Sequence, residues 1–180
     1  MKTWIALLKA INMVGKHKMS MKDLVALLEG LNARDVKTYR GSGNAVFRHR
    51  GKDAARLAKR ISTAVGKEYE FKPLVMLLET EQLARIIADN PFPEAEAEPG
   101  ALVVGLLTAE PEQPDWEAFE KVRRKSERFA LHGDVFYFYA PEGFHLSKIG
   151  PWLKRSFGEV DGTGRTWSTI VKVMAIAKEI

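Results

Sequence analysis

Two short polar stretches in the first half of the sequence contain the side chains best suited to binding an anion. Lysine and arginine attract phosphate or carboxylate groups, and imidazole, amide and hydroxyl groups donate hydrogen bonds to them. The candidate residues are Lys9, Asn12, Lys16, His17 and Lys18 in the first stretch, and Arg40, Ser42 and Asn44 in the second. Arg165 is a further candidate, as a bidentate clamp if the C-terminal helix packs nearby. Surface loops are usually polar, so the alternative is that these side chains are simply solvated.

Other kinds of chemistry find little support in the sequence. Cysteine is absent, which excludes a disulfide, a thiolate nucleophile and any cysteine-ligated metal. The four histidines are widely separated and form no zinc-binding pattern. Gly15-Lys16 does not open a phosphate-binding P-loop, because His17 stands where Ser or Thr would bind magnesium. We therefore expect no metal and no cofactor and assign no catalytic residue, and whether the protein is an enzyme stays open.

The first half of the chain predicts the element order of a ferredoxin-like unit. Apolar residues form a strand over 3–11, and Ser20 with Asp23 forms a capping-box pattern before a helix with leucines at helical spacing. Residues 36–39 and 45–47 form strands on either side of a turn over 41–44. A second helix starts after Asp53 and stops at Gly66, followed by a strand over 69–78 and a connecting helix over 80–88. This β-α-β-β-α-β order is typical of the split βαβ fold.

The second half repeats much of this order. It predicts a strand over 101–108, a helix capped by Asp115, strands over 129–131 and 135–139, a helix over 147–157 and a C-terminal helix over 169–178. The two halves are not visibly alike in sequence, so the duplication is inferred from element order only. The predicted fold class is α+β, with two ferredoxin-like halves in tandem.

The distribution of charged residues also divides the chain between the two predicted halves. Residues 1–90 carry 17 Lys and Arg against 9 Asp and Glu, and residues 91–180 carry 11 against 14, so that the halves are +8 and −3 within a net charge of +5. Residues 91–100 contain three prolines and alternating glutamates, which disfavour a helix or a central strand. We predict a basic ferredoxin-like subdomain over 1–90, a Pro/Glu-rich linker over 91–100, and a second ferredoxin-like subdomain with a C-terminal helix over 101–180.

The predicted topology locates the candidate anion site. In a split βαβ unit, the end of the first strand, the start of the first helix and the turn between the second and third strands share one end of the sheet. We therefore expect the loop over 12–19 and the turn over 40–44 to be neighbours. The start of a helix has unbonded N–H groups and a partial positive charge, which favour an anion there. The sequence thus predicts a binding module with an anion site at one end of the first sheet.

Partners other than a small anion are also considered. A basic run over 40–60 suits weak, salt-sensitive binding of nucleic acid, although Ser42 and Asn44 replace two stacking aromatics of the RNA-recognition motif. An enzyme acting on a small anionic metabolite is a further alternative, as is head-to-tail pairing of the two halves between chains. The longest uncharged stretch, 99–109, is too short to span a membrane, so we expect a cytoplasmic protein without membrane contact. The oligomeric state is not predicted.

Four landmarks in the sequence occur in the order found in a known family. These landmarks are Thr3-Trp-Ile-Ala-Leu-Leu-Lys-Ala-Ile-Asn12, Thr38-Tyr-Arg-Gly-Ser-Gly-Asn-Ala-Val-Phe47, Asn90-Pro-Phe92 and Arg165-Thr-Trp-Ser-Thr169. They resemble a bacterial family of unknown function whose members typically read LLRGIN near the start, SGN in the first hairpin and RNWNT near the end. The resemblance implies an α+β fold with ferredoxin-like halves and no established activity.

The sequence departs from this family pattern at five positions. Lys9 stands where the family favours Arg, Ala10 where it favours Gly, and Gly41 where it favours Gln; Thr166 and Ser168 each stand where it favours Asn. If those positions line a ligand site in the family, this protein has an altered specificity or has lost the ligand. The residues that retain the pattern are Asn12, Lys16, Lys18, Tyr39, Ser42, Asn44, Arg165 and Trp167.

Overall fold

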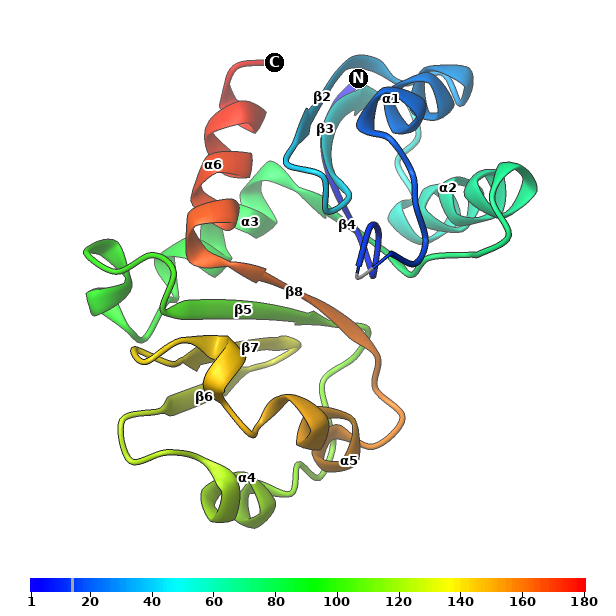
Figure 1. The fold of residues 1–180 in the computed structure, drawn as a ribbon. Coiled ribbons are helices and arrows are strands. Elements are labelled where there is room, and N and C mark those ends of the chain that lie inside the picture. The colour runs from blue at the N-terminus through cyan, green and yellow to red at the C-terminus, as the bar shows by residue number, and fades with distance from the viewer. Residues whose placement is uncertain (14) are drawn as a thin grey trace. The chain divides into compact units, whose positions relative to one another are not determined.

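A computed structural model, which describes residues 1–13 and 15–180, contains two four-stranded antiparallel sheets with helices packed on them (Figure 1). The chain forms two compact units: unit 1 comprises Met1–Ala88 and Val171–Ile180, and unit 2 comprises Asp89–Ile170. The fold class is therefore α+β with tandem ferredoxin-like halves, as the element order predicts. None of the helices in the described residues is long and apolar enough to cross a membrane.

Unit 1 has the full β-α-β-β-α-β order. Its sheet, sheet A, has the strand order β2-β3-β1-β4, so the first strand lies in the centre between the third and the fourth. The central strand is buried on both faces because its apolar run is continuous. The elements are β1 (Lys2–Leu8), α1 (Met21–Gly30), β2 (Arg34–Tyr39), β3 (Asn44–His49), α2 (Ala54–Glu68), β4 (Val75–Glu79) and α3 (Thr80–Ala88).

The core of unit 1 lies between sheet A and helices α1 and α2. Trp4, Ala6 and Leu8 alternate along β1 and pack with Phe47 of β3 and with leucines of α1. Both helices begin where the sequence predicts. Ser20 accepts a hydrogen bond from the Asp23 N–H at 3.0 Å, and Asp53 accepts one from the Arg56 N–H at 2.9 Å.

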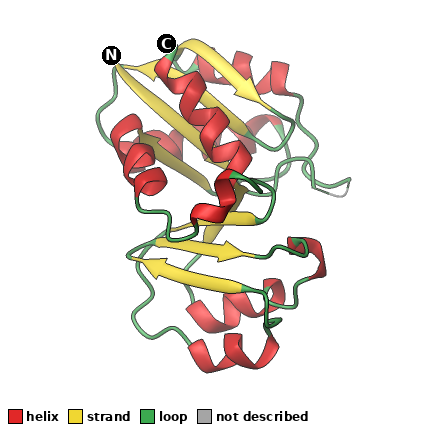
Figure 2. Ribbon diagram, turned by 90° about the vertical axis from the view of Figure 1, so that its left-hand side faces the viewer, coloured by secondary structure: helices red, strands yellow, loops and turns green. Residues whose placement is uncertain are grey.

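Unit 2 repeats the topology, since its sheet, sheet B, has the strand order β6-β7-β5-β8, with the strands labelled in Figure 1. Figure 2 shows the strands in yellow and the helices in red from another side. Its core is aromatic: Phe119 of α4 and Phe157 of α5 pack against Phe136 and Phe138 of β7. The elements are η1 (Pro93–Glu96), β5 (Leu102–Leu107), α4 (Trp116–Val122), β6 (Arg128–His132), β7 (Val135–Tyr139), η2 (Phe144–Leu146), η3 (Gly150–Trp152), α5 (Leu153–Phe157), β8 (Gly162–Thr166) and α6 (Trp167–Lys178), where η marks a 3-10 helix.

In unit 1, the strand predicted over 69–78 begins only at Val75, after Pro73, and forms β4. Two elements of unit 2 also differ from the sequence prediction. Strand β8 is not predicted, because Gly162 and Gly164 interrupt its apolar pattern; it forms because β5 offers it a partner along Val103–Leu107. The helix predicted over 147–157 is reduced to η3 and α5, since Gly150 and Pro151 disfavour a continuous helix. With β8 in place, unit 2 has all four strands of the ferredoxin-like sheet.

The Pro/Glu-rich segment 91–100 belongs to unit 2. The Arg128 guanidinium lies 5.1 Å from the Phe92 ring and 4.8 Å from the Tyr139 ring, and donates to Glu94 Oε1 at 2.6 Å. Ala95 of η1 is buried. The subdomain boundaries at 90 and 100 stay a prediction.

The turn between β2 and β3 approaches the end of β1 very closely, and we expect it to tolerate only glycine at position 43. Gly43 has φ +75°, and a Cβ there would lie 2.9 Å from Ile11 Cγ1 and 3.0 Å from Leu8 Cβ. Gly43→Ala is expected to lower the free energy of unfolding by about 2–4 kcal/mol, because a strained backbone and an overpacked contact add. Urea denaturation would measure this loss.

Gly15→Ala is the matched control, since Gly15 has φ +77° but nothing lies within 4 Å of the added Cβ. Only the backbone strain applies at position 15, so the free energy of unfolding is expected to fall by at most about 1–2 kcal/mol. Equal losses in the two variants would contradict the close approach of the turn to β1.

Candidate functional site

Asn12 joins the two stretches that the sequence predicts to be neighbours. Its Nδ2 donates to the Met19 carbonyl and to the Gly41 carbonyl, both at 2.7 Å, and its Oδ1 accepts from the Met19 N–H at 2.9 Å. One amide therefore ties the loop over 9–20 to the turn over 40–44. We call this region the loop end of unit 1. Both N–H groups of the Asn12 amide, and one of the two acceptor positions of its oxygen, are used in holding this region together.

Ser42 and Asn44 also stabilise the turn. The Asn44 side chain is fully buried, and its Nδ2 donates to the Tyr39 carbonyl at 2.8 Å and to Ser42 Oγ at 3.0 Å. A backbone hydrogen bond of 2.8 Å runs from the Leu8 N–H to the Gly43 carbonyl. A buried amide has to be bonded in this way, since an unpaired one is destabilising. These two candidates thus act on the structure of the turn.

Three cations at the loop end are exposed to solvent, namely Lys16, Lys18 and Arg40. Lys18 directly precedes Met19, and Arg40 directly precedes Gly41, so the Asn12 amide holds a neighbour of each. The Arg40 guanidinium lies 5.4 Å from the ring of Tyr39. Lys9 is half-buried at the end of β1, and its backbone N–H donates to the Leu74 carbonyl at 2.8 Å.

His17 contacts the loop end with both its ring and its main chain. Its ring stacks on Phe71 with 4.5 Å between centroids, and its Nδ1 lies 3.2 Å from the Ala10 carbonyl. Its carbonyl accepts from the Asn12 N–H at 3.1 Å. The imidazole therefore fixes the path of the loop. Phe71 was not predicted as part of this region, because the contact joins residues far apart in sequence.

An open hollow of about 460 Å³ lies beside these residues, lined by Asn12, Gly15, Lys18, Met19, Ser20, Asp23 and Tyr69. It includes the start of α1. Hydrogen bonds from Ser20 and Tyr69 hold the pKa of the Asp23 carboxyl below its ordinary value of 3.8, so this group is ionised at neutral pH. The hollow therefore presents one cation, one carboxylate and the Tyr69 hydroxyl. Sequence patterns did not point to Tyr69, which lies at the C-terminal cap of α2.

Arg165 lies in β8 of unit 2, opposite Val104 of β5. Its guanidinium donates to Thr163 Oγ1 and to the Gly164 carbonyl, each at 2.8 Å. Burial lowers its pKa to about 10, which leaves it charged at neutral pH. Whether Arg165 takes part in an anion site stays a prediction.

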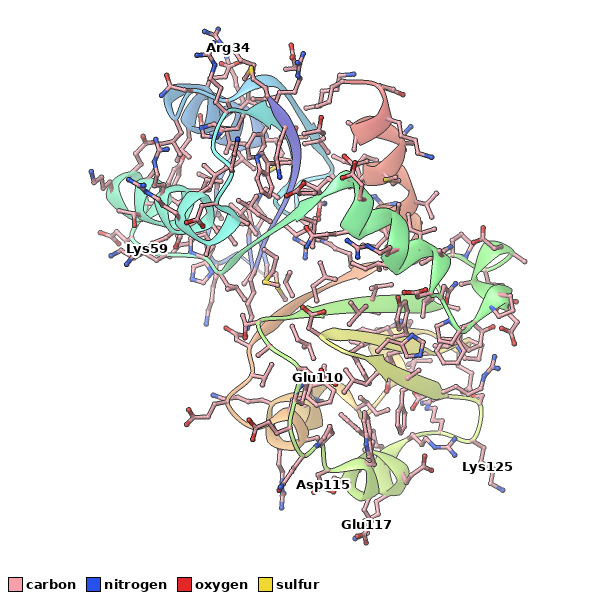
Figure 3. The ribbon with its side chains drawn as sticks, turned by 180° about the vertical axis from the view of Figure 1, so that it is seen from behind. Arg34, Lys59, Glu110, Asp115, Glu117 and Lys125 are labelled. Atoms are coloured by element: carbon pink, nitrogen blue, oxygen red, sulfur yellow. The ribbon has the colours of Figure 1, made fainter. Side chains whose placement is uncertain are left out.

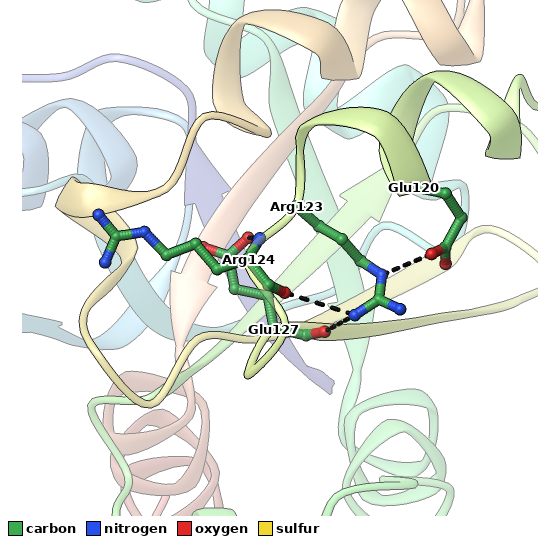
Figure 4. Close-up of polar contacts among 4 residues, drawn as sticks. All are labelled: Glu120, Arg123, Arg124 and Glu127. Carbon is green, nitrogen blue, oxygen red and sulfur yellow. Dashed lines mark hydrogen bonds and ion pairs between the residues drawn. The ribbon is translucent and has the colours of Figure 1, made fainter.

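A second polar cluster, not predicted from the sequence, follows α4 in unit 2 (Figure 4). Arg123 Nε donates to Glu120 Oε2 at 2.7 Å, and Arg123 Nη1 donates to the Glu127 carbonyl at 2.9 Å. The buried Glu127 carboxylate accepts from the Arg124 N–H at 2.9 Å. Arg124 Nη1 and Ser126 Oγ each donate to Glu142, at 2.5 Å. The cluster holds the connection between α4 and β6. Among the described residues no group of three or more His, Asp or Glu side chains could hold a metal ion.

Comparison with known proteins identifies a family and a fold. The family model described as "Protein of unknown function (DUF1697)" matches residues 1–137. A solved structure of a conserved bacterial protein from Streptococcus pneumoniae is similar over 98% of both chains, with 19% sequence identity and a TM-score of 0.71. At that identity the likeness shows the fold alone. The comparison with curated proteins gave no significant match.

The backbone at Ala10 gives a direct test of the loop end. Ala10 has φ +61°, a left-handed conformation that costs an L-residue about 1–2 kcal/mol. Ala10→Gly is therefore expected to raise the free energy of unfolding by about 0.5–1 kcal/mol, since the entropy that glycine adds to the unfolded chain offsets part of the gain. Ala26→Gly, at an exposed position inside α1, should instead lower it by about 1 kcal/mol. A loss in both variants would show that Ala10 is not strained.

Glu142 should make folding sensitive to acid. Hydrogen bonds from Ser126 and Arg124 hold the pKa of its carboxyl below the ordinary value of 4.5. A lowered pKa in the folded state stabilises the protein above the unfolded value, and this stabilisation is lost as pH falls through the folded value. The stability difference between the native protein and Glu142→Gln should thus be present at neutral pH and shrink below about pH 4.5. Urea denaturation across that range would measure it, with Glu159→Gln, which removes a carboxylate at another exposed position of unit 2, as the matched variant.

Proposed function

The chain belongs to the DUF1697 family of proteins of unknown function, and on that premise we propose that it binds a small anion at the loop end of unit 1. The anion is a phosphate or carboxylate group, and Lys16, Lys18 and Arg40 attract it. The observation that carries the proposal is the Asn12 amide, which bonds the residue after Lys18 and the residue after Arg40 at 2.7 Å each. Cations from two separate chain segments are thereby held at one end of the sheet.

The strained backbone at the loop end supports a binding role. Positive φ angles occur at Ala10, Asn12, His17 and Arg40, with values of 53° to 61°. Strain of this kind persists only where the surrounding structure enforces it, and it is concentrated at functional sites. The loop is thus held in one conformation before a ligand arrives, which lowers the entropy lost on binding.

Binding without catalysis fits the state of the polar side chains better than an enzyme does. Asn12, Ser42 and Asn44 are engaged in the hydrogen bonds of the turn, and the His17 ring is stacked on Phe71. Groups used in this way are poorly placed to transfer protons to a substrate. The flexible cations remain, and they suit electrostatic attraction of an anion.

The carboxylate of Asp23 limits what the hollow accepts. It lines the same hollow as Lys18, and its lowered pKa keeps it ionised. Two negative charges close together repel each other, so the anionic group has to lie on the side of Lys16, Lys18 and Arg40. The part of a ligand nearest Asp23 is then a hydrogen-bond donor or a cation.

Titration with inorganic phosphate, and separately with acetate, followed by amide chemical shifts would test this function. We expect shift changes confined to residues 9–20 and 40–44. In the variant K16Q/K18Q/R40Q the dissociation constant should rise at least roughly tenfold, because three charge-assisted contacts are removed. The variant R34Q/R50Q/K52Q removes the same charge from the opposite end of sheet A and should bind normally. An equal loss in both variants, or shifts spread over the whole chain, would contradict a site at the loop end.

A further inference from the structure

The end of unit 1 opposite the loop end carries cations in positions that oppose folding. Arg34 of β2 and Arg48 of β3 are direct cross-strand partners, so both side chains lie on the same face of sheet A. Like charges placed directly opposite one another destabilise a sheet. Asp35 compensates in part, since its Oδ2 lies 3.5 Å from Arg48 Nη1. Arg34 extends outward from the unit (Figure 3).

Arg50 and Lys52 continue this surface in the connection between β3 and α2. Both are exposed, and together with Met1 and Lys2 they line an open hollow of about 410 Å³. Lys2 is paired with Glu79 Oε1 at 2.6 Å. Within residues 1–13 and 15–180, no ion pair joins Arg34, Arg50 or Lys52 to an acidic side chain. We call the end of unit 1 that carries Arg34, Arg48, Arg50, Lys52 and the first two turns of α2 the basic end of unit 1.

The first two turns of α2 carry three more exposed cations, Arg56, Lys59 and Arg60. Arg56 lies in the first turn, where the helix dipole is positive and a cation is unfavourable. Arg56 and Arg60 are also four residues apart on one helix face, where like charges repel. Asp53 offsets part of this as the N-cap. Figure 3 shows Lys59 pointing outward. These placements of positive charge are therefore each unfavourable for folding, and a polyanion that neutralises them would remove this cost.

We propose that the basic end of unit 1 binds the sugar–phosphate backbone of double-stranded nucleic acid, independently of base sequence. Several separate cations at one end of the unit match a polymer with regularly spaced phosphates, and guanidinium groups bind phosphate with two hydrogen bonds. This proposal does not depend on the small anion at the loop end, which lies at the other end of sheet A.

The aromatic and apolar side chains of the basic end favour a duplex over a single strand or a lipid surface as its partner. Trp4 and Phe47, the aromatic residues of the adjoining strands, are each 1% exposed and cannot stack on bases. Binding of single strands normally relies on such stacking. Among the large exposed apolar side chains of the described residues, only Met1 lies at this end. A lipid surface is disfavoured because stable membrane attachment needs more apolar contact.

Fluorescence anisotropy with a labelled DNA duplex of about 20 base pairs, between about 50 and 200 mM KCl, would test the proposal. We expect affinity to fall steeply with salt. The variant R34Q/R50Q/K52Q should bind the duplex at least roughly tenfold more weakly and show a salt slope smaller by about 3. Circular dichroism should show that it folds, since all three residues are exposed.

The variant K16Q/K18Q/R40Q is the matched control, because it removes the same net charge from the loop end. It should keep duplex binding while it loses phosphate binding, so the two proposals fail or hold separately. If both triple variants lose the same duplex affinity, binding depends on the net charge of the protein and not on the location of the cations. That result would overturn the proposal that the basic end is the binding site. Equal affinity for a single strand of the same length, or tighter binding to vesicles containing phosphatidylserine, would also overturn it.

Discussion

The loop end depends on how closely the turn between β2 and β3 approaches the end of β1. The Leu8 N–H donates to the Gly43 carbonyl at 2.8 Å, and the missing side chain of Gly43 leaves room for Ile11. Asn12 follows at once and bonds to the Gly41 carbonyl. If the turn were further away, neither bond could form. The position of Arg40 beside Lys16 and Lys18 therefore depends on this one contact.

This contact also gives physical roles to the family landmarks. In the SGN landmark, Gly43 fits a space with no room for a Cβ, while Asn44 bonds Ser42 and the Tyr39 carbonyl. In the first landmark, Asn12 holds the loop, and position 10 has a positive φ that glycine adopts most easily. These landmark residues therefore maintain the shape of the loop end. The positive charge that would attract an anion comes from the flexible side chains of Lys16, Lys18 and Arg40, which lie beside these landmark residues.

The sequence predicted mainly those features that depend on interactions between residues close together in the chain, and it missed several that depend on contacts between distant residues. Helices with a capping residue and apolar periodicity were predicted well, as for the helix capped by Ser20, because those signals are local. Strand β8 was missed because its place is set by β5 and not by its own composition. The proximity of the loop and the turn followed from topology alone. Tyr69 and Phe71 escaped prediction, because their contacts with Asp23 and His17 depend on how α2 ends.

Unit 1 is not a continuous stretch of chain, since it needs Val171–Ile180 in addition to Met1–Ala88. An ion pair of 3.2 Å between Lys37 Nζ and Glu179 Oε2 links β2 to these last residues. Ribosomes add about 5–20 residues per second, so roughly 4–16 s separate the synthesis of the two parts. A nascent chain therefore carries an incomplete first unit for that interval. The surface that residues 171–180 later cover is then accessible to chaperones.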